Sequence, residues 1–169
     1  MIRSARLVLR LLREEDLEDL HQIFSNPLAM RYWDRPAWQD METTRKLLAA
    51  FMQDAPERQL SCAIEHEGEL IGRIGMSRHF EIGYILHPDW WGKGLGTEAI
   101  AAFLPELFVR FPNADALTAE IDPRNTGSAR VLEKNGFACV RIERQNFLYG
   151  EDEWCDTAYY RLNRPTSEK

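Results

Sequence analysis

Hydrophobic positions follow a strand rhythm and then a helix rhythm at the start of the chain. Residues 6–12 (RLVLRLL) alternate and then become apolar, which predicts a first strand. Residues 13–24 place Leu17, Leu20 and Phe24 on one face of a helix, with acidic residues in the first turn, where the helix dipole favours them. The chain is therefore expected to begin with a strand that leads into an amphipathic helix.

An aromatic loop interrupts the next helical pattern. Residues 26–38 contain two prolines together with Tyr32, Trp33 and Trp38, and helical spacing returns over residues 41–53. This pattern predicts two helices joined by a loop that is rich in aromatic side chains.

Residues 59–88 contain three short strand-like runs. The turn sequence HEGE separates the first two runs, and the third, over residues 80–86, ends before Pro88. We expect an antiparallel meander here.

From Thr97 to Phe111 apolar residues recur at helical spacing, so a helix is expected to start where a glycine-rich stretch ends. Pro105 is expected to kink this helix, because its ring removes the hydrogen bond to the carbonyl of Ala101. A strand is predicted to follow over residues 116–121.

A short helix with a recognisable signal at each end comes next. Asn125 is suited to the N-cap, which places Ser128 at the third helical position, and Asn135-Gly136 is suited to a left-handed C-cap.

Two further strands, over residues 137–147 and 153–163, are predicted to form a long hairpin. The sequence contains no internal repeat and no linker. We therefore expect a single domain over residues 1–169, with its core over about 6–163 and a loose tail at 164–169.

The composition narrows the class of protein. A chain of 169 residues with 44% hydrophobic content can bury one substantial core. The 21 basic and 27 acidic residues give a net charge of −6, and no run of lysine or arginine suits a phosphate backbone, so nucleic acid is not an expected partner. A cationic substrate would be favoured by the overall charge.

The cysteines and histidines indicate no metal site. Cys62, Cys139 and Cys155 are widely spaced, which fits a reducing, cytoplasmic setting, and the four histidines share no metal-ligand spacing. No apolar run has the length needed to span a membrane or to serve as an export signal.

The segment HPDWWGKGLGTEA, residues 87–99, suggests an anion-binding loop. Glycines at alternate positions let backbone N–H groups approach a ligand, and the start of the next helix adds unpaired N–H groups and a positive dipole end. The spacing fits neither a Walker A loop nor a dinucleotide-binding fingerprint. Glycines that merely turn the chain are the alternative interpretation.

The segments EIGYILHPDWWGKGLGTEA and NTGSARVLEKNGF together resemble the acetyl-CoA-binding core of the GCN5-related N-acetyltransferases (GNATs), in particular the branch that acetylates ribosomal-protein amino termini. Both ends of the chain resemble the same branch. The resemblance implies an α/β (α+β) fold with a mixed central sheet of about six to seven strands, flanked by helices, whose central strands splay apart. It also implies acetyl-CoA as co-substrate and no metal.

Carried over position by position, the resemblance implies a set of residues that contact coenzyme A. The glycine loop would bind the pyrophosphate, the end of the central strand would pair with the pantetheine arm, and the short helix would face the sulfur. The implied residues are Leu86, His87, Gly92, Lys93, Gly94, Leu95, Gly96, Thr97, Asn125, Ser128 and Leu132.

Acetyl transfer to an amine needs a base for the amine and a proton for the departing thiolate. Leu132 stands where many relatives have a tyrosine that serves as the general acid, and leucine cannot donate a proton, so Ser128 is the remaining candidate acid. A small polar residue that bonds locally at the third helical position is the alternative interpretation of Ser128. Glu81 is a candidate base that would act through water, and an ordinary surface role is its alternative.

The fraction of an amine that is neutral at pH 7 favours one class of acceptor over another. An α-amine is about one-tenth neutral at pH 7 and a lysine side chain about one part in 2,500, a gap of about 3–4 kcal/mol that suits a weak base to the α-amine. Tyr32, Trp33, Asp34 and Trp38 fall where the family places the acceptor groove, and core packing explains those aromatics equally well.

The favoured function is therefore acetyl transfer from acetyl-CoA to a primary amine, with a peptide or protein N-terminal α-amine as the favoured acceptor. A non-catalytic coenzyme A-binding module and a nucleotide-dependent oxidoreductase are the alternatives. The sequence leaves open whether the acceptor is a ribosomal-protein terminus, another peptide, a polyamine or a drug-like amine. It also leaves open whether the chain is a monomer or a homodimer.

Overall fold

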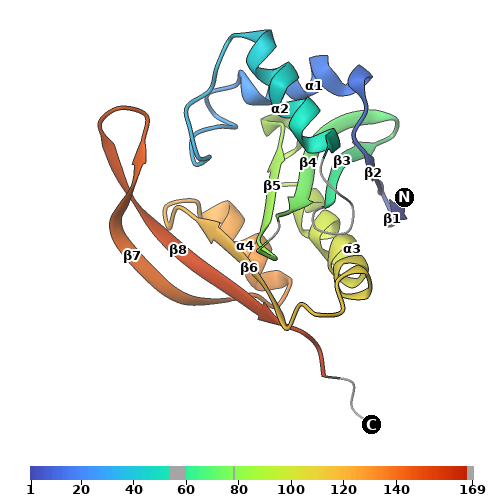
Figure 1. The fold of residues 1–169 in the computed structure, drawn as a ribbon, viewed down its shortest axis with the longest axis vertical. Helices are drawn as coiled ribbons and strands as arrows, with labels where there is room; N and C mark the ends of the chain where they lie inside the picture. The colour runs from blue at the N-terminus through green and yellow to red at the C-terminus, as the bar shows by residue number, and fades with distance from the viewer. Residues whose placement is uncertain (54–59, 78, 167–169) are drawn as a thin grey trace.

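Two β-sheets that meet at one edge organise the computed structural model, which describes residues 1–53, 60–77 and 79–166. The first sheet is antiparallel and has five strands in sequence order (Figure 1). These strands are β1 (Ile2–Arg3), β2 (Leu7–Leu11), β3 (Leu60–His66), β4 (Glu69–Met76) and β5 (Ile82–Leu86).

The second sheet has three antiparallel strands in the order β6-β8-β7. They are β6 (Ala116–Ile121), β7 (Ala138–Tyr149) and β8 (Glu153–Asn163). The predicted C-terminal hairpin is confirmed, and β8 lies between its hairpin partner and β6, which long-range pairing alone decides.

Within the described residues, four α-helices surround the sheets: α1 (Leu17–Phe24), α2 (Met41–Gln53), α3 (Leu95–Arg110) and α4 (Thr126–Lys134). Short 3₁₀ turns precede two of them, η1 (Glu14–Asp16) and η2 (Pro88–Trp90). No helix in the described ranges is long and apolar enough to cross a membrane.

Alternation along the strands supplies two hydrophobic cores, one on each face of the first sheet. On β3, Cys62 and Ile64 face the core that contains α3, whereas Ala63 between them faces the core that contains α1 and α2. Because both faces of the sheet are covered, its central strands β3 and β4 are buried at most positions. The three cysteines of the chain are free thiols.

The two sheets are joined through the start of β5 and the middle of β6. Glu81 and Thr118 form an isolated parallel bridge, and the N–H of Thr118 donates to the carbonyl of Phe80 at 2.9 Å. Beyond this point β5 and β6 belong to separate sheets, which leaves the central strands splayed (Figure 1). The expected fold class is confirmed, with eight strands in the described residues rather than six to seven.

Two local expectations need correction. The third helix, which contains Pro105 as expected, begins at Leu95 rather than at Thr97. Arg164, which was assigned to a loose tail, is bound to the core: its guanidinium donates to the carbonyls of Phe108, Phe111 and Ala114 at 2.7–3.0 Å. Residues 167–169 of that tail lie outside the described residues.

Candidate active site

The glycine loop lies between β5 and the N-terminus of α3. Gly92 and Gly94 have φ angles of +73° and +77°, which L side chains rarely adopt, and Gly94 is the N-cap of α3. A Cβ added at Gly92 would meet no atom within 4 Å, so conformation rather than space requires glycine there. The unpaired N–H groups in the first turn of α3 follow directly, which suits the loop to an anion.

The end of β5 is fixed by the residues that follow it. The carbonyl of Leu86 accepts a hydrogen bond from Nε1 of Trp91 at 2.9 Å, so this backbone oxygen is already engaged. His87 caps η2 by accepting the N–H of Asp89 at 3.3 Å on its Nδ1. These contacts lock the turn between the strand and the glycine loop.

The first turn of α3 packs tightly on its neighbours. Leu95 is buried in the core, and a Cβ at Gly96 would lie 3.3 Å from Cδ1 of Leu86, so this glycine allows the helix to approach β5. The carbonyl of Thr97 accepts from Nδ2 of Asn135 at 3.3 Å, which ties α3 to the C-terminal end of α4.

The start of α4 faces the splayed strands. Asn125 is its N-cap as predicted, because Oδ1 accepts the N–H of Ser128 at 3.1 Å. The carbonyl of Ser128 in turn accepts from the hydroxyl of Tyr84 on β5 at 3.2 Å. Burial raises the pKa of Tyr84 to about 12, so this phenol stays protonated at neutral pH. Leu132 is 0% exposed within the core, so its predicted contact with a cofactor is not available.

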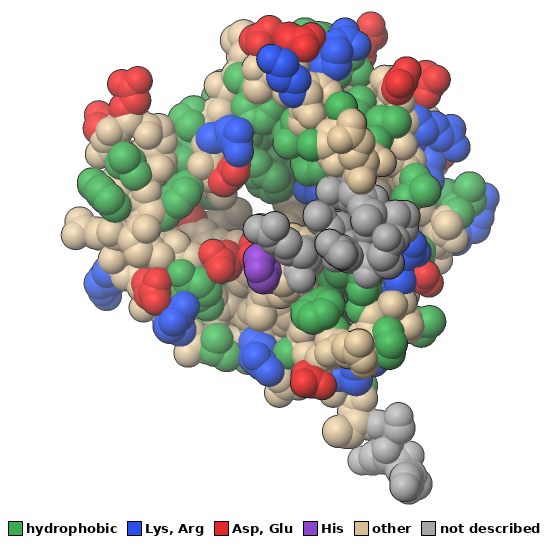
Figure 2. Space-filling model, in the orientation of Figure 1, with side chains coloured by type: hydrophobic (Ala, Val, Ile, Leu, Met, Phe, Trp, Pro, Cys, Tyr) green, Lys and Arg blue, Asp and Glu red, His purple; other side chains and the backbone are tan. Residues whose placement is uncertain are grey.

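A cavity of about 180 Å³ lies beside the start of β5. Its walls come from the 31–34 loop, the start of β5, the C-terminal end of β6 and the β7–β8 hairpin. The hollow near the centre of Figure 2 has acidic and basic side chains at its edge. The lining residues are Arg31, Tyr32, Trp33, Asp34, Glu81, Glu120, Ile121, Asp122, Phe147, Tyr149, Cys155, Asp156 and Thr157.

Glu120 influences the protonation of Glu81, a second carboxylate in the cavity lining. Glu81 precedes β5 and Glu120 lies on β6, the two strands that the bridge between Glu81 and Thr118 holds together. Burial raises the pKa of Glu81, and the negative charge of Glu120 raises it further. A carboxylate with a raised pKa beside a second carboxylate is suited to accept a proton and to attract a cation.

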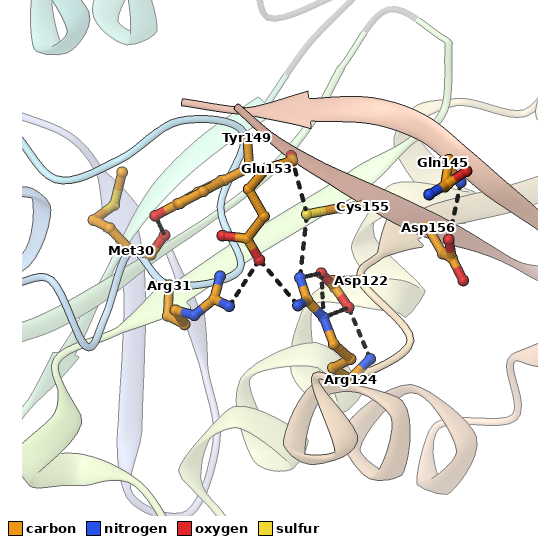
Figure 3. Close-up of polar contacts among 9 residues, drawn as sticks. All are labelled: Met30, Arg31, Asp122, Arg124, Gln145, Tyr149, Glu153, Cys155 and Asp156. Atoms are coloured by element: carbon orange, nitrogen blue, oxygen red, sulfur yellow. Dashed lines mark hydrogen bonds and ion pairs between the residues drawn. The ribbon is translucent and has the colours of Figure 1, made fainter. Parts of the chain in front are cut away.

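A network of arginines and carboxylates adjoins the cavity (Figure 3), and Arg31, Asp122 and Cys155 of this network are among the lining residues. The carboxylate of Glu153 accepts from Arg31 at 2.9 Å and from Arg124 at 3.0 Å. Arg124 also donates to Asp122 through Nε at 2.9 Å and to the sulfur of Cys155 at 3.1 Å. Although burial opposes the effect, the hydrogen bonds from Arg124 lower the pKa of Asp122, which keeps this carboxylate ionised.

The tip of the β7–β8 hairpin is tied to the aromatic loop. The hydroxyl of Tyr149 donates to the carbonyl of Met30 at 2.8 Å (Figure 3). The guanidinium carbons of Arg31 and Arg124 lie 5.2 and 5.8 Å from the ring centroid of Tyr32. The hairpin and the loop therefore form one continuous wall of the cavity.

The acceptor residues expected from the sequence divide into two groups. Tyr32, Trp33 and Asp34 line the cavity, as expected. Trp38 does not line it: its ring stacks on Phe24 at 5.1 Å between centroids, and it belongs to the core beneath α1 and α2. Packing is the role of this tryptophan.

Sequence reasoning missed the far wall of the cavity. Glu120 and Asp122 are two positions apart at the end of a predicted strand, so their side chains share a face, and this spacing was a usable signal. Tyr149 and Asp156 reach the cavity only because the hairpin folds back, which no local pattern indicates. Among the described residues, no cluster of histidine, cysteine, aspartate and glutamate could hold a metal ion.

Comparison with known families identifies the fold's relatives. The acetyltransferase (GNAT) domain family matches residues 6–138. An uncharacterized N-acetyltransferase of Bacillus subtilis, YoaA, is 28% identical over 98% of this chain and 97% of its own length. Spermidine N(1)-acetyltransferase of Escherichia coli K12 is 29% identical over 85% of this chain and 79% of its own length.

Solved structures resemble the whole fold. A GNAT-family acetyltransferase from Bacillus anthracis has a TM-score of 0.85 at 27% identity and covers 96% of this chain and 97% of its own. Spermidine N-acetyltransferase from Vibrio cholerae, in complex with CoA and spermine, has a TM-score of 0.82 at 20% identity, with 95% and 96% covered. A Salmonella typhimurium enzyme that modifies the N-terminal serine of ribosomal protein L7/L12 has a TM-score of 0.81 at 19% identity, with 96% and 97% covered.

Proposed function

Because the chain belongs to the GNAT family of N-acetyltransferases, we propose that it transfers the acetyl group of acetyl-CoA to the α-amine of a peptide or protein N-terminus. The observation that carries this proposal is the carboxylate-lined cavity, which opens beside the splayed strands and contains Glu81. A neighbour solved with CoA and spermine supports coenzyme A as the donor and an amine as the acceptor.

The residues around the splay fit the donor. The N–H groups from Gly92 to Thr97 would bind the pyrophosphate, because they begin a helix and stand next to two left-handed glycines. Asn125 and Ser128 would face the sulfur end from the start of α4. The thioester itself supplies an activated acyl carbon.

Chemically, the neutral amine forms a bond to the acyl carbon and the carbon–sulfur bond breaks. Glu81, acting through water, would take the proton that the amine loses, which its raised pKa favours. The hydroxyl of Ser128 would give a proton to the thiolate and recover one from solvent. The transfer is then balanced, with coenzyme A and an amide as products.

Protonation favours the α-amine as acceptor. Glu81 is a weak base compared with an amine, and the α-amine needs about 3–4 kcal/mol less than lysine to become neutral at pH 7. Glu81 and Glu120 would hold the incoming ammonium before it loses its proton, because an added cation relieves the repulsion between them.

A polyamine is the second candidate acceptor. The cavity is lined by five carboxylates, those of Asp34, Glu81, Glu120, Asp122 and Asp156, which would also favour a substrate with more than one ammonium group. A relative in Escherichia coli is a spermidine N(1)-acetyltransferase.

A paired acceptor assay tests the proposal. One peptide is prepared with its α-amine free and its lysine blocked, a matched peptide with the reverse pattern, and spermidine is the third acceptor. Thiol release and the mass of the product are measured with acetyl-CoA. We expect the free α-amine to react fastest. Faster reaction of spermidine would transfer the assignment to polyamines, and faster reaction of the lysine peptide would contradict the assigned acceptor.

A further inference from the structure

Arg6, in the turn between β1 and β2, reaches across the molecule to the first turn of α3. Its backbone N–H donates to Oε1 of Glu98 at 2.8 Å, and its Nε and Nη2 both lie 2.7 Å from Oε2 of the same carboxylate. The hydroxyl of Ser4 adds a further bond to Oε1 at 2.7 Å. The two segments are 92 residues apart in sequence, so this contact is purely a product of the fold.

The same guanidinium also holds the glycine loop. Nη1 of Arg6 donates to the carbonyl of Lys93 at 3.1 Å, and a Cβ on Gly94 would lie 3.6 Å from Nη2. The carbonyl between the two left-handed glycines is thereby fixed toward Arg6. This bond limits the rotation of the peptide unit that joins Lys93 to Gly94, which is the unit that leads into the N-cap of α3.

A closed ring of contacts surrounds this bond. The ammonium of Lys93 lies 4.5 Å from the ring centroid of Trp90, and Trp90 packs edge-on against His66 at 5.0 Å. Nδ1 of His66 lies 3.0 Å from the carbonyl of Arg6, which completes the circuit. The loop is therefore held by contacts from the β1–β2 turn, from the end of β3 and from α3 together.

The charges of Glu98 and Arg6 affect how well a phosphate binds at the N-terminus of α3. Glu98 in the first turn of α3 favours the helix but repels a phosphate bound at the same end. Although burial opposes the effect, the hydrogen bonds from Ser4 and Arg6 lower the pKa of Glu98 and keep it ionised. The guanidinium of Arg6 offsets that negative charge beside the loop.

We propose that Arg6 is a positioning residue for coenzyme A: by binding Glu98 and the Lys93 carbonyl together, it holds the glycine loop in the conformation that receives the pyrophosphate. This inference rests on the proposed function, in which coenzyme A is the donor. Arg6 would act through the loop rather than through the reacting atoms. Its loss should therefore weaken binding of the nucleotide end of the cofactor and leave the chemical step intact.

Calorimetric binding of coenzyme A to the full chain tests the inference. We expect Arg6→Ala to raise the Kd about tenfold, because hydrogen bonds from a charged group are lost. Arg6→Lys should fall between wild type and Arg6→Ala, since a single ammonium cannot replace the fork of donors. Arg45→Ala is the matched control. Arg45 is an exposed arginine paired with a glutamate, Glu42 at 3.4 Å, and it lies on α2. Its removal should leave the Kd unchanged.

Two further readouts separate positioning from other roles. Turnover with S-acetylpantetheine, which lacks the pyrophosphate, should be the same in Arg6→Ala and wild type, and kcat at saturating acetyl-CoA should also be unchanged. The tenfold loss should persist in 0.5 M salt, where the Debye length is only about 4 Å and long-range attraction is screened. Where Arg6→Ala does not fold, Arg6→Lys provides the same measurements.

An unchanged Kd in a folded Arg6 variant would overturn the inference. An equal loss with S-acetylpantetheine, or a loss that vanishes in high salt, would overturn it as well. If wild type itself fails to bind coenzyme A, the proposed function fails instead, so the two failures are distinguishable.

Discussion

The role proposed for Ser128 is chemical rather than stabilising. Its described hydrogen bonds both use the backbone, from its N–H to Asn125 and from Tyr84 to its carbonyl, and alanine would keep both. We predict that Ser128→Ala lowers kcat about 100-fold, with the KM for acetyl-CoA nearly unchanged, because a proton donor is lost only in the transition state. Steady-state kinetics and a thermal melt on the same variant check this. Wild-type turnover in a folded variant would exclude Ser128 as the acid.

Glu81 is predicted to oppose stability while it supports catalysis. Its pKa is raised in the folded protein above the ordinary value of 4.5, so folding favours its protonated form. The ionised carboxylate therefore destabilises the fold at pH values above its folded pKa, and the cost disappears below pH 4.5, where both states are protonated.

We accordingly predict that Glu81→Gln raises the Tm at pH 8 and that the increase shrinks as the pH is lowered toward 4.5. Turnover should fall at pH 8, where the wild-type carboxylate is ionised and can act as a base. Melts across this range, with activity measured in parallel, provide the test. An increase in Tm that does not depend on pH would show that the carboxylate is not the cause.

Packing, which the sequence does not display, decided two expectations at single residues. Leu132 and Trp38 have the residue types and positions of site residues, yet Leu132 is fully buried in the core and Trp38 stacks on Phe24. The residue type alone does not show whether a leucine or a tryptophan lies in the core or in a binding groove. Only the packing of distant elements decides between them.

At the scale of elements, the glycine loop joins β5 to α3 and is the proposed site of the coenzyme A pyrophosphate. Gly94 has a φ of +77°, so Gly94→Ala should strain the loop and cost about 1 kcal/mol of stability. We predict that it also weakens coenzyme A binding, because the N-cap of α3 must shift.

Gly68 is the matched control for this prediction. It lies in the β3–β4 turn with a φ of +87° and has nothing within 4 Å of an added Cβ. Gly68→Ala should therefore lose similar stability while it keeps wild-type affinity for coenzyme A. If Gly94→Ala and Gly68→Ala bind coenzyme A with equal affinity, the glycine loop does not take part in binding the cofactor.

Elements with local signals were predictable, and elements set by long-range pairing were not. Asn125 and Gly136 fix both ends of α4 by their own cap chemistry, and the structure has these caps. The two-residue strand β1 carries no pattern of its own and exists through its pairing with β2. Glu81 was found because it lies beside a recognisable strand, whereas the hairpin wall of the cavity depends on the place of β8 between β6 and β7.

At the scale of the whole molecule, a ligand that bridges the loop and α4 should stabilise the fold. We predict that acetyl-CoA adds about 2.7 kcal/mol at one hundred times its Kd, and that NADH and ATP add far less. Thermal melts with each ligand at the same concentration provide the comparison. A larger shift with NADH would favour the nucleotide-dependent alternative.

The central claim is that the protein transfers the acetyl group of acetyl-CoA to an amine that binds beside the splayed strands. The stoichiometry of one reaction tests this claim most directly. Wild-type protein, acetyl-CoA and a peptide with a free α-amine are mixed, and free thiol and acetylated peptide are quantified together. The account predicts equal molar amounts of the two products, formed about 100-fold more slowly by Glu81→Gln. Tight binding of acetyl-CoA with no acetylated amine from any acceptor, or thiol release without an acetylated product, would contradict it.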